Sequence, residues 1–308
     1  MTQKQTFFSI VIPTYNRPER LATCLGAIAH LNYPRDRFEV IVVDDGSDTP
    51  MEPVVAPFRQ QLDITLITQS NAGPATARNK GVAKAKGEFL VFTDDDCTPD
   101  PDWLKALADH FTTAPDSLIG GLAINALPDN LFSTASQLLI DYLYDYYNTD
   151  PNQATFFASN NFALAKETFH QLGGFDTTFP LAAGEDREWC DRWLHNGYQM
   201  IYAPQAKVYH SHHLTLKRFW RQHFNYGRGA FHFHQLRAKR NLDKMKVEPF
   251  SFYLDLLTYP FSKPSKQPSL LLAILFCLSQ VANVAGFFWE RSTQTTTAKR
   301  QLSQTACD

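Results

Sequence analysis

Short apolar runs alternate with segments of helical periodicity over the first hundred residues of the chain. The runs have the length and the content of β-branched and aromatic residues that are typical of buried strands. They occupy residues 7–12, 38–43, 64–68 and 88–93. After the first run, Leu21, Leu25 and Ile28 recur at helical spacing. Further helices are expected at 57–61 and from Pro74 onward. Strands that alternate with helices predict an α/β fold with a parallel sheet.

The same pattern continues in the middle of the chain. Leu104, Leu107 and Phe111 lie on one face of a predicted helix. Further apolar runs at 118–123 and 200–203 have the character of strands. The α/β part is therefore expected to extend to about residue 210.

The composition supports a folded protein and limits its partners. The chain has 308 residues, 44% of them hydrophobic, which is enough for one large α/β domain with an appendage. A net charge of −2 offers no general attraction for nucleic acid. Five cysteines without a CxxC pair indicate neither a disulfide framework nor a zinc site, and they favour a reducing compartment. The sequence shows no apolar signal-peptide core and no N-glycosylation sequon, so the catalytic part is expected to face the cytosol.

Carboxylates directly follow two of the predicted strands. Asp94, Asp95 and Asp96 end the fourth run, and Asp44 and Asp45 end the second. Both groups are expected at the carboxyl edge of the sheet, where open α/β sheets bind ligands. Three adjacent carboxylates repel each other unless a cation lies among them, and hard divalent cations prefer such oxygens. The alternative is a solvated turn that caps the helix near residue 101.

Motifs of other nucleotide-binding proteins are absent from the sequence. No G-x-G-x-x-G follows the first run and no G-x-x-x-x-G-K-[ST] occurs, so neither a dinucleotide site nor a P-loop is indicated. A receiver-type signalling domain also gathers carboxylates at strand ends, but such a domain would end near residue 120. In the helix from Pro74, Arg78 and Lys80 lie near free backbone N–H groups, where they either contact a phosphate or are merely solvated.

Four motifs taken together resemble the family 2 glycosyltransferases over residues 7 to about 230. They are IVIPTYNR at 10–17, VVDDGS at 42–47, ARN at 77–79 and FTDDD at 92–96. The resemblance implies a GT-A fold, with a mainly parallel central sheet and helices on both faces. It also implies a nucleotide-diphosphate-sugar donor, Mn²⁺ or Mg²⁺ under the diphosphate, and inversion at the anomeric carbon.

The resemblance assigns roles to residues at the predicted sheet edge. Pro13 and Asp45 match the positions that receive the base of the donor. Asp94 and Asp95 match the acidic part of the donor site, and Asp96 would ligate the metal directly. A cation at this point would stabilise the negative charge that develops on a leaving nucleoside diphosphate.

Three further residues belong to the expected site. Tyr15 lies next to the donor-binding positions, and Arg228, between two glycines, is a candidate hinge and phosphate contact. His210 is a candidate metal ligand, because several GT-A enzymes complete their metal site with a histidine at a similar distance after the base motif. His212 and His213 are expected to support this ligand or to take no part.

An acidic pair after a glycine cluster supplies the candidate catalytic base. Glu185 and Asp186 follow Gly184 at a predicted helix start, where helix capping is the simplest explanation. The family pattern of Gly-Gly-Phe-Asp, here at 173–176, followed by Glu-Asp puts the general base at Asp186, with Glu185 as its neighbour. A general base contributes roughly 10²–10⁴-fold to the rate. Exchange of Asp186 for Asn is therefore expected to abolish transfer.

The sequence predicts further segments after a catalytic domain at 1–213. Residues 214–249 are basic and aromatic, which suits an anionic membrane face, a diphosphate-carrying lipid acceptor or a lid over the donor better than nucleic acid. Residues 250–291 are hydrophobic, and the run at 270–289 either spans a membrane or lies in its plane. Residues 292–308 are expected to form a polar, disordered tail.

These expectations combine into one function. The chain is expected to be an inverting glycosyltransferase on the cytosolic face of a membrane, in polysaccharide or lipid-linked glycan assembly, without a nucleic acid partner. The alternative is a membrane-associated partner protein that binds a nucleotide sugar without transferring it. A processive synthase fits less well, because the chain lacks Gln-x-x-Arg-Trp and multiple predicted spans.

Overall fold

The computed structural model describes residues 6–179, 183–240 and 248–305, which belong to two compact units. The first unit consists of Met1–Leu127, Leu143–Thr178 and Asp186–His212. The second unit consists of Pro128–Tyr142, Phe179–Glu185 and His213–Asp308. Each unit is therefore assembled from three separate stretches of the chain.

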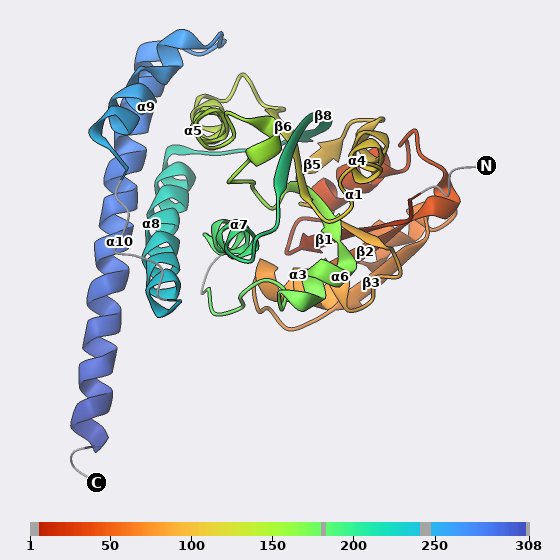
Figure 1. The fold of residues 1–308 in the computed structure, drawn as a ribbon, viewed down its shortest axis with the longest axis horizontal. Coiled ribbons are helices and arrows are strands. Elements are labelled where there is room, and N and C mark those ends of the chain that lie inside the picture. Colours follow the sequence, from red (N-terminus) through yellow and green to blue (C-terminus); the bar gives the residue numbers. More distant parts are fainter. Residues whose placement is uncertain (1–5, 180–182, 241–247, 306–308) are drawn as a thin grey trace. The chain divides into compact units, whose positions relative to one another are not determined.

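A mixed eight-stranded sheet is the frame of the first unit (Figure 1), in the order β3-β2-β1-β4-β7-β6-β8-β5. The first four strands in this order are parallel, whereas β7 is antiparallel to both neighbours. β6 and β8 are parallel again, and β5 is an antiparallel edge strand. The α/β prediction is confirmed. The strands are β1 (Phe8–Thr14), β2 (Phe38–Asp44), β3 (Ile64–Thr68), β4 (Phe89–Thr93), β5 (Cys97–Pro99), β6 (Leu118–Asn125), β7 (Asn161–Ala165) and β8 (Met200–His210).

The helices of the first unit connect these strands. They are α1 (Pro18–Ile28), α2 (Glu52–Val55), α3 (Pro74–Val82), α4 (Trp103–Phe111), α6 (Lys166–Gln171) and α7 (Glu185–His195), whose first residue belongs to the second unit. Helix α5 (Leu131–Tyr147) begins in the second unit and ends in the first. The helix expected at 57–61 is wrong in position. Helix α2 lies before that range and a 3₁₀ turn (Ala56–Phe58) overlaps only its first two residues, because Pro53 and Pro57 each occupy a first-turn position.

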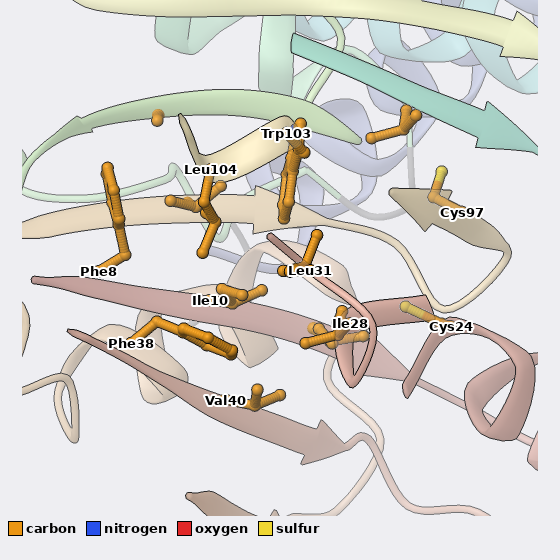
Figure 2. Packing of buried hydrophobic residues seen from close by; sticks show 14 of the residues in the cluster. Phe8, Ile10, Cys24, Ile28, Leu31, Phe38, Val40, Cys97, Trp103 and Leu104 are labelled. Atoms are coloured by element: carbon orange, nitrogen blue, oxygen red, sulfur yellow. The ribbon is translucent and has the colours of Figure 1, made fainter. Parts of the chain in front are cut away.

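Alternate residues of the central strands face two different helix layers. Val40 and Val42 pack into the core that contains residues of α1 and α4, whereas Ile41 and Val43 pack against Ala77 of α3. Figure 2 shows the first of these cores, in which the following side chains lie together: Phe8, Ile10, Ile28, Trp103 and Leu104. This alternation accounts for helices on both faces of a sheet whose strands β1 and β2 are fully buried.

Asn161 fixes three strands at the far end of the sheet. Its buried side-chain oxygen accepts a hydrogen bond from Nε1 of Trp103 at 2.8 Å. Its Nδ2 donates to the carbonyl oxygens of Leu122 on β6, at 3.0 Å, and Ala206 on β8, at 2.9 Å. Gly121 allows this close approach, because a Cβ there would collide with Ala206 and Asn161. The result is a fixed path for β8, the strand that ends at His210.

The second unit is built around three helices, α8 (Leu216–Lys239), α9 (Phe250–Ser262) and α10 (Ser269–Thr305). Gly229 of α8 lies directly against Ala183, and the ring centroid of Phe179 is 4.7 Å from that of His232. Helix α10 continues through the predicted polar tail to Thr305. Within the described residues, Ser269–Gln294 is the one stretch long and apolar enough to cross a membrane, judged by length and composition.

Candidate active site

Three aspartates follow β4, and two of them, Asp95 and Asp96, meet two arginines from the loop and helix after β1. Nη1 of Arg17 lies 3.0 Å from Oδ1 of Asp95 and 3.4 Å from Oδ2 of Asp96. Nη1 of Arg20 lies 2.9 Å from the same oxygen of Asp96. The repulsion expected among adjacent carboxylates is thus offset by two guanidinium groups. The hypothesis of a merely solvated turn does not fit, because Asp95 and Asp96 are buried.

Two histidines at the end of β8 approach the same carboxylate. Nε2 of His210 lies 3.3 Å from Oδ1 of Asp96, and Nδ1 of His212 lies 3.7 Å from Oδ2. One ligand atom from each of the three residues lies within 4.8 Å of the others. Carboxylate oxygen and imidazole nitrogen are both ordinary metal ligands, so this set can hold one divalent cation. The sequence assigned only His210 to this position, and the structure adds His212.

Charges within this cluster shift the pKa values of its members. Burial raises the pKa of Asp96, but hydrogen bonds from His210 and His212 and the charge of Arg17 outweigh it, so the pKa falls well below its usual value. Burial lowers the pKa of His210, but its hydrogen bond to Asp96 more than compensates and raises it. Burial dominates at Asp95 and raises its pKa to about 6, against the opposing charge of Arg17. The neighbours of Asp96 therefore favour its ionised form.

The loops after β1 and β2 are joined to each other at the sheet edge. The backbone N–H of Asn16 donates to Oγ of Ser47, and the Asn16 amide exchanges two hydrogen bonds with Asp48. Oγ1 of Thr14 donates to Oδ2 of Asp95 at 2.8 Å, which connects this loop pair to the acidic cluster. Tyr15 extends from the same loop and is exposed. Pro13 is buried within β1.

Asp45 holds the loop that leads into α3. Its carboxylate accepts hydrogen bonds from Nε2 of Gln69 and from the backbone N–H groups of Ala72 and Gly73, at 2.7, 2.9 and 2.8 Å. Gly73 has φ of 87°, a conformation that suits glycine. The carboxylate predicted to receive a base thus also determines where α3 begins.

Arg78 connects the acidic cluster with the candidate base. Its side chain is buried, and its Nη2 donates to Oδ1 of Asp94 at 2.7 Å. The guanidinium also lies 5.5 Å from the ring centroid of Phe175, and its charge acts on Asp186. Desolvation raises the pKa of Asp186, while the N–H of Arg187 and the charge of Arg78 oppose the rise. Arg78 therefore lies between two carboxylates of the first unit.

The other two predicted site residues belong to the second unit. Glu185 is the buried first residue of α7. Nε of Arg228 donates to Oε2 of Glu290 at 2.7 Å, so the guanidinium predicted to contact phosphate is ion-paired within its own unit. Arg17 and Arg20 were not predicted. Arg17 ends the IVIPTYNR motif and Arg20 lies three positions after it. The aspartates that they meet lie more than 70 positions further along the chain, so no local sequence signal indicates the contact.

The comparison with known families identifies the protein class. The model of glycosyl transferase family 2 matches residues 9–173, more than half of the chain. The chain belongs to glycosyl transferase family 2. A second model, described as the N-terminal domain of galactosyltransferase, matches residues 143–214. The predicted family is confirmed, and the protein is a glycosyltransferase.

Individual relatives and solved structures agree with this assignment. The chain is 27% identical over 205 residues to the glycosyltransferase AglE of Haloferax volcanii, which covers 66% of each chain. A Pyrobaculum calidifontis mannosyltransferase in complex with GDP-Man and Mn²⁺ superposes with a TM-score of 0.61 at 22% identity, over 97% of this chain and 81% of that one. S. aureus TarS in complex with UDP-GlcNAc gives 0.54 at 18% identity, over 94% and 92%. These neighbours confirm the predicted GT-A fold. The chain spans between 24% and 66% of the length of the curated relatives compared.

Proposed function

We propose that this glycosyltransferase moves a sugar from a nucleotide-diphosphate donor to an acceptor hydroxyl, with inversion at the anomeric carbon. The observation that carries the proposal is the convergence of Asp96, His210 and His212 with two arginines at the carboxyl edge of β4. A nucleotide-sugar donor is supported by the two structural neighbours, which were solved in complex with GDP-Man and UDP-GlcNAc. Polysaccharide or lipid-linked glycan assembly remains part of the proposal.

Asp96, His210 and His212 would hold a divalent cation, which when bound neutralises negative charge on the leaving diphosphate. The mixed oxygen and nitrogen set suits Mn²⁺ better than Mg²⁺, which prefers oxygen ligands in octahedral geometry. Arg17, whose side chain is 45% exposed, has room to leave the carboxylates and contact a phosphate oxygen. Its charge would then interact with the donor phosphate instead of with Asp95 and Asp96.

Asp186 would accept the proton of the acceptor hydroxyl. Burial raises its pKa, which makes it a stronger base than an ordinary aspartate, and the charge of Arg78 favours its ionised form. Arg78, held by Asp94, would keep Asp186 oriented without taking part in the proton transfer. Glu185, adjacent and buried, would support the position of the helix start.

The proposal also includes attachment to the cytosolic face of a membrane. Its support is the apolar stretch Ser269–Gln294, with a mean hydropathy of 2.1. The five cysteines, of which the structure describes four as free thiols, fit a reducing compartment.

Nucleotide release from a panel of UDP-, GDP- and dTDP-sugars tests the reaction. We expect release from one donor with Mn²⁺, none with a chelator, and none from Asp96→Ala. Asp109→Ala, an exposed aspartate on α4, is the matched control and should behave as the wild type. Release by Asp96→Ala at the wild-type rate would contradict the metal assignment. Donor binding without release from any sugar would instead favour the non-catalytic partner.

A further inference from the structure

Helix α10 has two apolar faces along its first twenty residues, and the second unit covers one of them. The inner face contains the following buried residues: Leu272, Leu275, Phe276, Ser279, Ala282 and Glu290. The outer face contains the following exposed residues, here called the outer stripe: Leu270, Ile274, Cys277, Val281, Val284 and Phe288. Neighbours in the outer stripe are alternately four and three positions apart, so they form one continuous band about 27 Å long.

The inner face of α10 is fixed against α8 by close backbone contact. A Cβ on Gly227 would collide with the backbone of Asn283, and one on Gly286 would collide with the backbone of Phe224. Next to this contact, Arg228 of α8 is ion-paired with Glu290. Small residues at such a crossing let two helix backbones approach each other closely. α8 and α10 therefore form one packed pair over this part of α10.

Two polar residues within the apolar run of α10, Ser279 and Gln280, form hydrogen bonds within the helix and leave the outer stripe apolar. Oγ of Ser279 is buried and donates to the carbonyl oxygen of Phe276 at 2.7 Å. Nε2 of Gln280 donates to the same Oγ at 3.2 Å. Ser279 is thus buried against the protein, and Gln280 is hydrogen-bonded to it within the helix.

This packing is incompatible with α10 crossing a bilayer. A helix that crosses must bring its packed partner into the hydrocarbon, and α8 carries exposed cations such as Lys217, Arg218 and Arg221. Charged side chains on the lipid-facing side of a membrane helix are strongly unfavourable. The outer stripe is the part of α10 that lipid can reach while α8 stays in contact.

We propose that the outer stripe lies in the plane of a membrane surface that contains anionic lipid, with α10 parallel to the bilayer. Charge complementarity supports this occupant, since Lys263 precedes the stripe and Arg291 follows it, and both are exposed. Trp289 is 58% exposed at the end of the stripe, where interfacial aromatic residues are typical. Such in-plane helices combine one apolar face with cations at its border.

A second copy of the chain fits the outer stripe less well. Helices that pair through a stripe of alternating four- and three-residue spacing normally carry charged residues on both sides of the seam. No charged residue occurs from residue 269 to 289. The flanks of the stripe are apolar as well, with Leu271 44% exposed. A wide apolar band whose exposed cations lie beyond its two ends, and not along its sides, suits lipid better than a coiled-coil partner.

Flotation of the full-length protein with vesicles of phosphatidylcholine and phosphatidylserine tests the inference. We expect the wild type to float with the vesicles and to be released by alkaline carbonate, as an in-plane helix should be. Val284→Asp should lower vesicle partitioning about tenfold, because it places a charge within the apolar face. Val284→Leu should bind as the wild type does. Gln205→Asp adds the same charge at an exposed site of the first unit and should also leave binding unchanged.

Three results would overturn the inference. They are a wild type that stays in the aqueous fraction, a protein that resists carbonate, and a Val284→Asp variant that changes from dimer to monomer with vesicle binding unaltered. The first leaves no lipid contact, the second indicates a spanning helix, and the third indicates a second copy on the stripe. The assay needs no donor or acceptor, so its outcome is independent of the proposed reaction. A melting curve for each variant shows that it remains folded.

Discussion

Asp186 is the proposed general base, and the burial that raises its pKa also makes its ionised form unfavourable for folding. Its raised pKa means that the folded protein favours the protonated carboxyl group. The resulting stabilisation is present at low pH and is lost as the pH rises from 3.8 through the raised pKa. A general base works only when it is ionised, so transfer should decline as the pH falls through that same value. Stability and activity are expected to change in opposite directions with pH.

Replacing Asp186 by Asn separates these two effects. The variant should lose at least about 10²-fold in turnover, since the amide cannot accept the proton. Its melting temperature at pH 8 should equal or exceed that of the wild type, because the ionised carboxylate is gone. Turnover and melting curves at pH 5 and pH 8 check both, with Glu167→Gln at an exposed position as control. Normal turnover by Asp186→Asn would remove Asp186 from the base role.

His212 and His213, which follow His210 in the chain, offer a matched pair of variants that tests the metal site. His212 lies 3.7 Å from Asp96, whereas His213 is exposed one residue further along. His212→Ala should weaken Mn²⁺ binding about tenfold or more, by analogy with the loss of residues around other metal sites. His213→Ala should leave the affinity unchanged. Titration of the protein with Mn²⁺ alone measures both, and equal affinities for the two variants would contradict the assignment.

Residues whose role depends on local motifs could be predicted, and those whose role depends on strand adjacency could not. Asp96 and His210 were found because an acidic triplet and a histidine stand at recognisable positions. Asn161 was not, because its partners on β6 and β8 are about 40 residues away in the chain. The sequence indicates Arg17 only as the last residue of the IVIPTYNR motif. Its distance of 3.0 Å to Asp95 depends on the pairing of β1 with β4.

At the scale of elements, strand β8 is longer than the apolar run in the sequence that predicts it. The apolar run stops at Ala203, before Pro204, which lacks a backbone donor. The strand nevertheless continues to His210, because the pairing with β6 shifts between Gly121 and Leu122 and passes over residues 204–206. A β-bulge of this kind re-aims the strand end. Hydrophobic patterning could not indicate it, and this strand end carries a metal-ligand candidate.

Gly121 gives this element a direct test. Gly121→Ala would push a Cβ into Ala206 and Asn161, so it should lower the free energy of unfolding by about 1–3 kcal/mol and weaken Mn²⁺ binding at His210. Gly26→Ala is the control, since a Cβ there meets nothing within 4 Å in helix α1. It should raise stability by about 0.5–1 kcal/mol. Chemical denaturation measures both changes, and an unaffected Gly121→Ala protein would disprove the close contact.

At the scale of the whole molecule, the sequence showed which segments are apolar but not which face of each is covered. The composition of the run at 270–289 is compatible with a spanning or an in-plane helix, because composition does not show which face of this helix packs against α8. The extension of α10 to Thr305 was also not expected from its polar residues. Helix packing supplies this information. The packing of α8 against α10 depends on Gly227 and Gly286. In the sequence alone, each of these glycines would only lower the expectation of a helix.

The contact of Gly229 with Ala183 affects how the protein can be shortened. Ala183 and Gly184 directly precede Glu185 and Asp186, and in three dimensions they pack against Gly229 of α8. A fragment that ends at residue 214 would retain both family matches completely. It would nevertheless leave the residues ahead of the proposed base, Asp186, without their packing partner. For expression work, the shortest useful fragment is therefore defined by this glycine contact and not by the borders of the family match.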